Sequence, residues 1–287
     1  MKEAINFGYL PEEYSNPENA GIVIIPVAYD GTSTWVKGAD KGPAAIIEAS
    51  GNMELYDIET DSEVYKKGIF TEEIITGEAS PADMIEAVTE TVKYYLERGK
   101  FTVVIGGEHS VSIGPIKAHT KQYENLTVLQ LDAHTDLREE YNGSKYNHAC
   151  VMARVKELCP IVQVGIRSMD YSEKKSIDSS RTFFAKDIYN NTDWIKKVIS
   201  KLSDNVYITI DLDVFDPSIM PSTGTPEPGG LLWYDVLVLL KAVSEKKNIV
   251  GFDVVELCPD AKNKAPDFLA AKLIYKLLSY KFEVGNK

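Results

Sequence analysis

The stretch LTVLQLDAHTD, residues 126–136, joins a strand signal to a cluster of ionisable side chains. Residues 126–131 are a short, largely apolar run, which is typical of a strand buried on both faces. Asp132, His134 and Asp136 then follow at every second position. Because side chains alternate along extended chain, we expect these three to project to one side, just beyond the end of the strand.

Similar apolar runs recur along the chain and alternate with segments of helical period. The expected strands are 22–27, 101–106, 126–131, 161–166, 206–210 and 249–255, with 182–185 as a weaker seventh. The expected helices are 42–55, 82–98, 112–123, 148–158, 191–203, 233–246 and 265–280. This alternation predicts an α/β fold with a mostly parallel sheet covered by helices on both sides. No linker, repeat or low-complexity tract divides residues 1–287, so we expect one domain.

Composition narrows the class of protein. The chain has 287 residues, of which 44% are hydrophobic, and its net charge is -12. An acidic chain is a poor match for nucleic acid, whose phosphates require basic patches, and its field favours a small cationic substrate. The N-terminal sequence MKEAINFGYL lacks the layout of a signal peptide, and no apolar run is long enough to span a membrane. Cys150, Cys159 and Cys258 form no CxxC motif, so we expect reduced thiols and a cytoplasmic location.

Acidic and imidazole side chains follow four of the expected strands. In parallel α/β sheets, ligands bind beyond the carboxyl ends of the strands. The residues at these ends are Glu108 and His109, then Asp132, His134 and Asp136, then Asp211, Asp213 and Asp216, and finally Glu256. So many carboxylates at one edge repel one another unless cations neutralise them.

Four aspartates and two histidines are a suitable ligand supply for two divalent metal ions that share a bridging water. A set of oxygen and imidazole ligands without thiolate favours Mn²⁺ or a similar ion over a structural zinc. His109, His134 and His148 all fall in or near this set, whereas His119 is expected to be an ordinary helix residue. The loop 216–230 contains four prolines, so we expect it to be rigid and to form part of the site.

These segments resemble the signatures of the ureohydrolases, the family of arginases, agmatinases and their relatives. The motifs are GADKGPAAI (38–46), GGEHS (106–110), DAHTD (132–136), DLDVFDP (211–217), STGTPEPGG (222–230) and VVELCP (254–259). The resemblance implies a three-layer α/β/α fold with a parallel, roughly eight-stranded sheet. It also implies two Mn²⁺ ions per chain, hydrolysis of a guanidino group to urea, and assembly into homotrimers or homohexamers.

The resemblance also implies roles for individual residues. The implied metal ligands are His109, Asp132, His134, Asp136, Asp211 and Asp213, with Asp132 and Asp211 bridging or flanking both ions. His148 matches the histidine that handles protons near the substrate, and Glu256 matches the carboxylate that holds the guanidinium. Asp136 would also contact the attacking water. Thr225 lies in the loop that lines the pocket, and Asp170 falls where relatives place an acid near the tail of the substrate.

The segment LREEYNGSKYN, 137–147, bears on the choice of guanidino compound. Arginases resemble one another in an Asn- and Ser-rich loop here, whereas this chain has Arg138 where Asn is expected, followed by Glu139 and Glu140. If the two glutamates face the pocket, they suit a substrate that ends in an amine, and agmatine, giving putrescine and urea, is the first choice. If Arg138 faces the pocket instead, guanidinobutyrate or guanidinopropionate is favoured.

Two other classes compete with a ureohydrolase. A metal-dependent deacetylase of related topology also uses Asp and His ligands at strand ends, but it should show a His-His pair, and this sequence has none. A binding protein with a decayed site should lack some ligands, whereas all six are present. We therefore expect an enzyme.

Overall fold

The computed structural model describes residues 6–77, 80–189 and 191–284. Residues 1–5, which begin the N-terminal stretch considered above for a signal peptide, lie outside the described residues. The described chain forms one sheet of eight parallel strands in the order β2-β1-β3-β8-β7-β4-β5-β6. The strands are β1 Ile22–Val27, β2 Ile69–Thr71, β3 Phe101–Gly106, β4 Leu126–Leu131, β5 Ile161–Ile166, β6 Thr182–Phe184, β7 Asn205–Asp211 and β8 Asn248–Val255.

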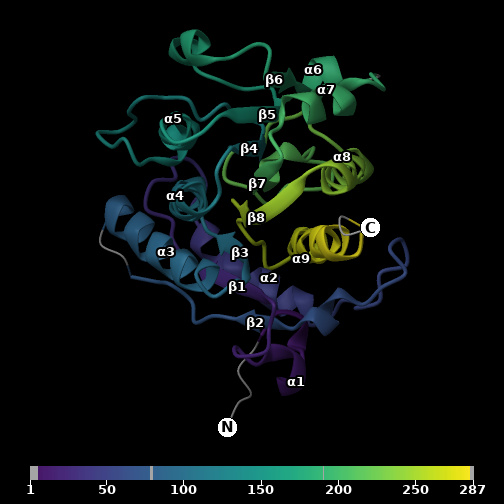
Figure 1. Cartoon of the computed structure of the whole chain (residues 1–287). Helices are drawn as coiled ribbons and strands as arrows, with labels where there is room; N and C mark the ends of the chain where they lie inside the picture. Colours follow the sequence, from purple (N-terminus) through teal and green to yellow (C-terminus); the bar gives the residue numbers. More distant parts are fainter. Residues whose placement is uncertain (1–5, 78–79, 190, 285–287) are drawn as a thin grey trace.

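Helices cover both faces of the sheet, which gives three layers (Figure 1). One face carries α3 Pro81–Leu96, α4 Ile113–Gln122 and α5 Val151–Lys156, and the other carries α2 Gly42–Ser50, α7 Trp194–Lys201, α8 Trp233–Lys246 and α9 Ala265–Ser279. A separate hydrophobic cluster lies between each helix layer and the sheet. The expectation of a parallel sheet between two helix layers is confirmed.

Short helices and turns complete the described chain. They are α1 Glu12–Ser15, α6 Ala185–Ile188, the 3-10 turns η1 Phe7–Tyr9, η2 Ala39–Lys41, η3 Val64–Lys67, η4 His109–Ser112, η5 His148–Cys150, η6 Tyr171–Ser176 and η7 Leu212–Val214, and the π-helical turn η8 Tyr280–Val284. The turn η7 directly follows β7, and η4 begins shortly after β3, so both help to set the directions of the side chains at these strand ends.

All seven expected strands are present, but β2 was not predicted. It has only three residues and lies at the edge of the sheet, so its sequence shows no run of buried apolar residues. The expected helix 42–55 ends at Ser50, because Gly51 follows and the chain turns there. The expected helix 148–158 is a 3-10 turn followed by the short α5.

The strand order places the four strands that carry ionisable ends next to one another. The chain builds β1 and β2, then β3, and then crosses to build β4, β5 and β6 farther along the sheet. Later, β7 and β8 fill the gap between β4 and β3. Ligand sites of open α/β sheets form at such points, where connections leave in opposite directions. The carboxyl ends of β3, β8, β7 and β4 therefore lie side by side in the middle of the sheet, on the side where all the parallel strands end.

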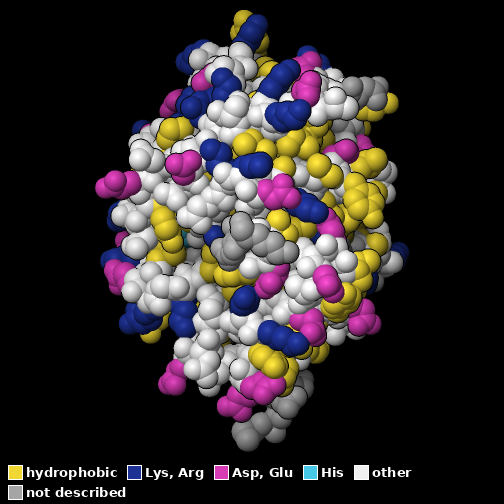
Figure 2. Space-filling model, turned by 45° about the vertical axis from the view of Figure 1, so that its right-hand side comes forward, with side chains coloured by type: hydrophobic (Ala, Val, Ile, Leu, Met, Phe, Trp, Pro, Cys, Tyr) yellow, Lys and Arg dark blue, Asp and Glu magenta, His cyan; other side chains and the backbone are white. Residues whose placement is uncertain are grey.

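The surface is mixed in character. On the face shown in Figure 2, acidic and basic side chains are interspersed with hydrophobic ones, and no large basic area is visible. Within the described ranges, no helix combines the length and apolarity that crossing a membrane requires.

Candidate active site

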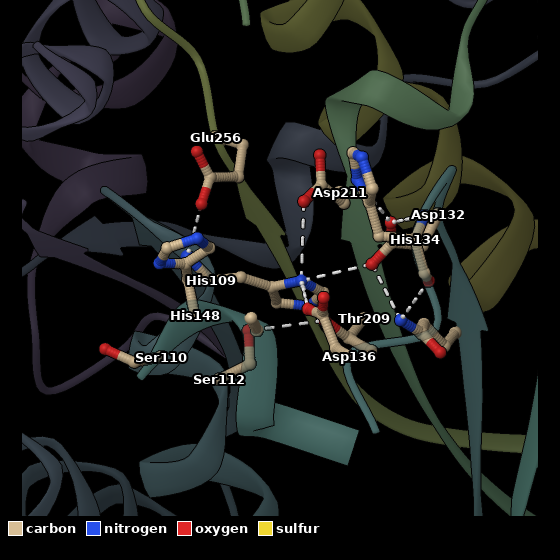
Figure 3. Close-up of polar contacts among 12 residues, drawn as sticks. His109, Ser110, Ser112, Asp132, His134, Asp136, His148, Thr209, Asp211 and Glu256 are labelled. Atoms are coloured by element: carbon tan, nitrogen blue, oxygen red, sulfur yellow. Dashed lines mark hydrogen bonds and ion pairs between the residues drawn. The ribbon is translucent and has the colours of Figure 1, made fainter. Parts of the chain in front are cut away.

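The ring of His109 lies at the centre of the candidate site. It enters from the turn after β3, and its Nδ1 atom lies 3.2 Å from Asp132 Oδ2, 3.0 Å from Asp136 Oδ2 and 3.3 Å from Asp211 Oδ2 (Figure 3). These carboxylates come from the loop after β4 and from the last residue of β7. Side chains that the sequence placed at the ends of different strands thus lie together around one imidazole nitrogen.

A second group of ligand atoms adjoins the first. His134 Nδ1 lies 2.8 Å from Asp213 Oδ2 and 3.7 Å from Asp132 Oδ1. Asp132 therefore belongs to both groups, with one oxygen toward each imidazole, as a bridging ligand requires. Asp211 belongs to the His109 group through Oδ2, and its Oδ1 accepts the Asp213 N–H at 2.8 Å.

Buried hydrogen bonds orient the His109 ring. Its Nε2 atom lies 3.0 Å from Thr209 Oγ1, and the Thr209 hydroxyl donates to Asp253 Oδ1 at 2.7 Å. Because the hydroxyl proton goes to Asp253, Nε2 carries the proton that Thr209 accepts, and Nδ1 presents a lone pair. Among the described residues, this buried Nδ1 has no hydrogen-bond partner. A lone pair that faces carboxylates repels them unless a cation lies between them, so the donor set fits a metal ion.

The pKa values reflect the same crowding. Burial, followed by the charges of Asp136 and Asp213, raises the pKa of Asp132 to about 7. Burial and the neighbouring aspartates also raise the pKa of Asp211 well above its usual range. Burial opposes charge on His134, but Asp213 and Asp132 outweigh it and raise its pKa to about 11. Without cations, the site therefore retains protons that metal ions would displace.

Two site residues adopt backbone conformations that L-residues rarely take. Asp136 has φ 51° and Glu256 has φ 70°. Such conformations cost about 1–3 kcal/mol each and persist where the surroundings fix them. At Asp136 the left-handed turn, rather than simple strand alternation, brings the carboxylate to His109. At Glu256 the N–H donates to Gly107 O at 2.7 Å, and Oε1 accepts the His109 N–H at 2.7 Å.

A cavity of about 160 Å³ opens from these groups to the surface. Both imidazoles, the carboxylates of Asp136, Asp211 and Asp213, and Glu256 line it. His148, Thr225 and Asp170, which were all expected near the substrate, also line it. His119 does not belong to the site: it is buried beside Tyr207, and its Nδ1 lies 2.7 Å from Pro115 O.

The orientation expected for the 137–147 loop is wrong. The described part of the chain lines the cavity with Arg138 and Tyr141 and with neither Glu139 nor Glu140. Glu139 is 74% exposed and pairs with Arg154 at 2.9 Å. The nearly buried Arg154 therefore draws Glu139 away, and the chain turns Arg138 inward, where its guanidinium stacks on the Tyr141 ring.

Two further acids, Asp170 and Glu173, line the cavity. Asp170 lies 3.8 Å from the Arg138 guanidinium and also caps η6 through the Ser172 N–H. Glu173 is buried and accepts hydrogen bonds from Thr135 and from the Leu137 N–H. Glu173 was not singled out in the sequence, because an acid inside a short polar turn has no local pattern that marks it.

The 216–230 loop is fixed by hydrogen bonds, as its prolines suggest. The Arg167 guanidinium donates to Asp213 O at 2.6 Å and to Glu227 O at 2.8 Å. Asp216 accepts the N–H groups of Gly229 and Gly230, which closes the loop. The loop thereby holds Gly224 and Thr225 at the cavity.

Comparison with known proteins agrees with this geometry. A sequence model of the arginase family matches residues 20–279, and the chain belongs to that family. It is 38% identical to the N(1)-aminopropylagmatine ureohydrolase of Synechocystis sp., over 96% of this chain and 94% of that protein. It is 33% identical to the agmatinase of Pyrococcus horikoshii, over 91% and 92%. The crystal structure of the agmatine ureohydrolase of Thermoplasma volcanium superimposes with a TM-score of 0.89 at 31% identity, over 99% and 96%.

The two ligand groups predict metal stoichiometry. Protein reconstituted with Mn²⁺ should bind two ions per chain, one for each group. His134→Ala should leave about one ion, because His134 belongs to one group, whereas Asp132→Ala should weaken both. Elemental analysis of desalted protein measures this, with the exposed Asp178→Asn as a control that keeps both ions. A single ion in active wild-type protein would contradict the binuclear site.

The pKa of Asp132 predicts a pH dependence. In the metal-free fold, the raised pKa means that the proton on Asp132 contributes stability below the pKa of the unfolded chain, and this stability is lost as pH rises through about 7. Mn²⁺ must displace that proton at low pH but not at high pH. The gain in Tm on adding Mn²⁺ should therefore grow between about pH 5.5 and about pH 8. Thermal unfolding with chelator and with excess Mn²⁺ measures the gain, and a pH-independent gain would refute the assignment.

Proposed function

We propose that this chain hydrolyses the guanidinium group of agmatine to give urea and putrescine, with two Mn²⁺ ions at the His109 and His134 groups. The observation that carries the proposal is the position of Glu256, whose carboxylate lies in the same cavity as both ligand groups. A guanidinium is planar and donates parallel hydrogen bonds, which a carboxylate accepts in pairs. Glu256 would thus hold the reacting carbon beside the metal site.

The backbone around Glu256 prepares it for this role. Its Oε1 is fixed by the His109 N–H, so the carboxylate has a defined direction. Gly224 adjoins the second oxygen: a Cβ atom there would lie 3.5 Å from Glu256 Oε2, in van der Waals contact, so glycine leaves this side of the carboxylate uncovered. The opening at Gly224 matches the approach of a flat cation to both oxygens.

His148 and Asp136 would serve the proton transfers. Divalent ions held by the two ligand groups would lower the pKa of a bound water and so supply the strong nucleophile that the poorly electrophilic guanidinium carbon needs near neutral pH. Asp136 would accept a hydrogen bond from that water. The attacking water must lose a proton and the departing amine must gain one, and His148, which lines the cavity, would accept the first and deliver the second. Burial lowers the pKa of His148, so its imidazole is neutral at rest.

The lining of the cavity includes groups that favour a substrate ending in an amine. Asp170 and Glu173 are acids there, and Arg138 is engaged by Asp170 and by the Tyr141 ring. An ammonium would be attracted by these acids, whereas an α-carboxylate would meet like charge. The names of the relatives point to the same class, because they are ureohydrolases of agmatine or of its aminopropyl derivative.

N(1)-Aminopropylagmatine is a second candidate substrate. The Synechocystis relative at 38% identity carries that name, whereas the Pyrococcus agmatinase is 33% identical. Trp35 lines the cavity and is 78% exposed, so its ring offers a face to a cation on a longer tail.

Homotrimeric or homohexameric assembly stays a prediction for this chain.

Substrate preference tests the proposal. Urea release from agmatine should exceed that from arginine by at least about a hundredfold in kcat/KM, or about 2.7 kcal/mol. Asp170→Asn should narrow this ratio, mainly by weakening agmatine. Glu139→Gln, on the solvent side of the same loop, is the matched control and should leave the ratio unchanged.

The same panel separates the alternatives. Higher kcat/KM for N(1)-aminopropylagmatine than for agmatine would select the second candidate. Preference for 4-guanidinobutyrate or arginine would instead show that Arg138 binds a carboxylate and that the proposed substrate is wrong. No urea from any of these four compounds or from guanidinopropionate would contradict the proposed ureohydrolase activity.

Glu256→Gln tests the guanidinium contact. The variant keeps the size and one oxygen but loses the charge, so kcat/KM should fall by about 3–4 kcal/mol of transition-state binding. Metal content should remain at the wild-type value, because Glu256 is not in either ligand group. Parallel measurement of urea release and bound Mn²⁺ checks both statements, and wild-type kcat/KM in this variant would exclude Glu256 from substrate binding.

A further inference from the structure

The hydroxyl of Thr32 lies between a buried acid and the histidine of the cavity. Thr32 Oγ1 is 2.8 Å from Glu108 Oε2 and 3.0 Å from His148 Nδ1, and it accepts the backbone N–H of His148 at 2.9 Å. Thr32 comes from the segment after β1, Glu108 from the turn after β3, and His148 from η5. Three segments distant in sequence thus meet at one oxygen atom.

The hydrogen bonds of the Thr32 hydroxyl bear on which ring nitrogen of His148 carries the proton. A hydroxyl donates one hydrogen bond and accepts two. Glu108 Oε2 already accepts the Ser110 N–H at 3.1 Å, so it acts as an acceptor and takes the Thr32 proton. Both acceptor positions of Thr32 then serve His148, one for its backbone N–H and one for Nδ1–H. In the neutral ring this leaves Nε2, on the opposite edge, as the unprotonated nitrogen.

The surroundings make this arrangement rigid. Glu108 is 0% exposed, and Ser110 binds both of its oxygens through N–H and hydroxyl groups. The Glu108 N–H donates to Tyr29 O at 2.9 Å, which ties the segment after β1 to the turn after β3. This approach requires glycine at position 107, where a Cβ atom would lie 2.0 Å from Tyr29 O. Tyr29 and Thr32 are therefore held at a fixed distance from Glu108.

We propose that Thr32, oriented by Glu108, is a positioning residue that holds His148 in the Nδ1–H tautomer and so leaves Nε2 to exchange protons with the substrate. This inference rests on the role of His148 in the proposed function. A histidine that transfers protons must present the correct nitrogen, and the partner of its other nitrogen decides which one that is. Thr32 touches no reacting atom in this scheme. It acts through the direction and tautomer of the imidazole.

The tautomer can be observed without any activity. In the full chain labelled with ¹⁵N-histidine and loaded with diamagnetic Zn²⁺, long-range ¹H–¹⁵N spectra distinguish protonated from unprotonated ring nitrogens. Only four histidines are present, and the signals that disappear in His148→Asn identify His148. Wild-type protein should show protonated Nδ1 and unprotonated Nε2. Thr32→Val should lose this pattern, and Thr32→Ser, which keeps the hydroxyl, should restore it.

Kinetics tests the consequence for turnover. Thr32→Val should lower kcat for agmatine by about tenfold to a hundredfold, because positioned proton transfer contributes at least this much. KM and metal content should change by less than about twofold, since Glu256 and the ligand groups are intact. Thr32→Ser should recover most of kcat.

Thr127→Val is a matched control for the loss of a buried hydroxyl. Thr127 also bonds a side chain, Ser203 Oγ at 2.8 Å, and also accepts a backbone N–H, that of Ser203 at 3.2 Å. It lies near the amino end of β4, away from the cavity. This variant should leave both the His148 spectrum and kcat unchanged, whatever its effect on Tm.

The outcomes separate this inference from the proposed function. Protonated Nε2 in the wild-type chain overturns the inference even if Thr32→Val fails to fold. Wild-type kcat in a folded Thr32→Val protein also overturns it. If wild-type protein releases no urea from any guanidino compound, the proposed function fails, while the spectra still decide the tautomer of His148.

Discussion

The candidate active site requires the fold to hold several buried carboxylates close together despite their mutual repulsion. Around His109 Nδ1, three carboxylate oxygens lie within 3.3 Å, and Asp132 extends the cluster to a second imidazole. In a buried setting such crowding raises the pKa values of the acids and opposes folding unless cations enter. The fold must therefore hold the ligands against their mutual repulsion, and the surrounding hydrogen bonds provide that support.

The support comes from the order in which the chain builds the sheet. Because β7 and β8 fill the gap between β3 and β4, four strand ends meet at the centre rather than at an exposed edge. The central strands are buried on both faces, so packing against the helices holds the backbone in place at the carboxyl end of each strand. The remaining adjustment is local, at Asp136 and Glu256, where a left-handed backbone turns each carboxylate toward His109.

The sequence predicted the parts of the molecule that obey a simple period. Every strand of six or more residues was found, because a mostly buried and largely apolar run marks it, and the six ligand candidates were singled out because they lie at or just beyond the ends of such strands. The three-residue β2 was missed because an edge strand needs no such run. Thr32, Glu173 and Arg167 gave no signal either, since the hydrogen bonds that give them their roles reach partners 36 to 116 positions away in the chain.

The orientation of the 137–147 loop is set by contacts outside the loop, which is why its sequence alone predicted it wrongly. A loop has no period that assigns its side chains to a face, so three neighbouring charges, Arg138, Glu139 and Glu140, can point either way. What decided the matter was Arg154 on α5, a nearly buried cation that pairs with Glu139 and turns Arg138 toward the cavity. The candidate catalytic and metal-binding residues thus lie at strand ends, which the sequence predicts. Substrate selection depends instead on loops, whose orientation is set by residues distant in the sequence. The match of this fold to an arginase-family structure therefore identifies the reaction class more firmly than the substrate.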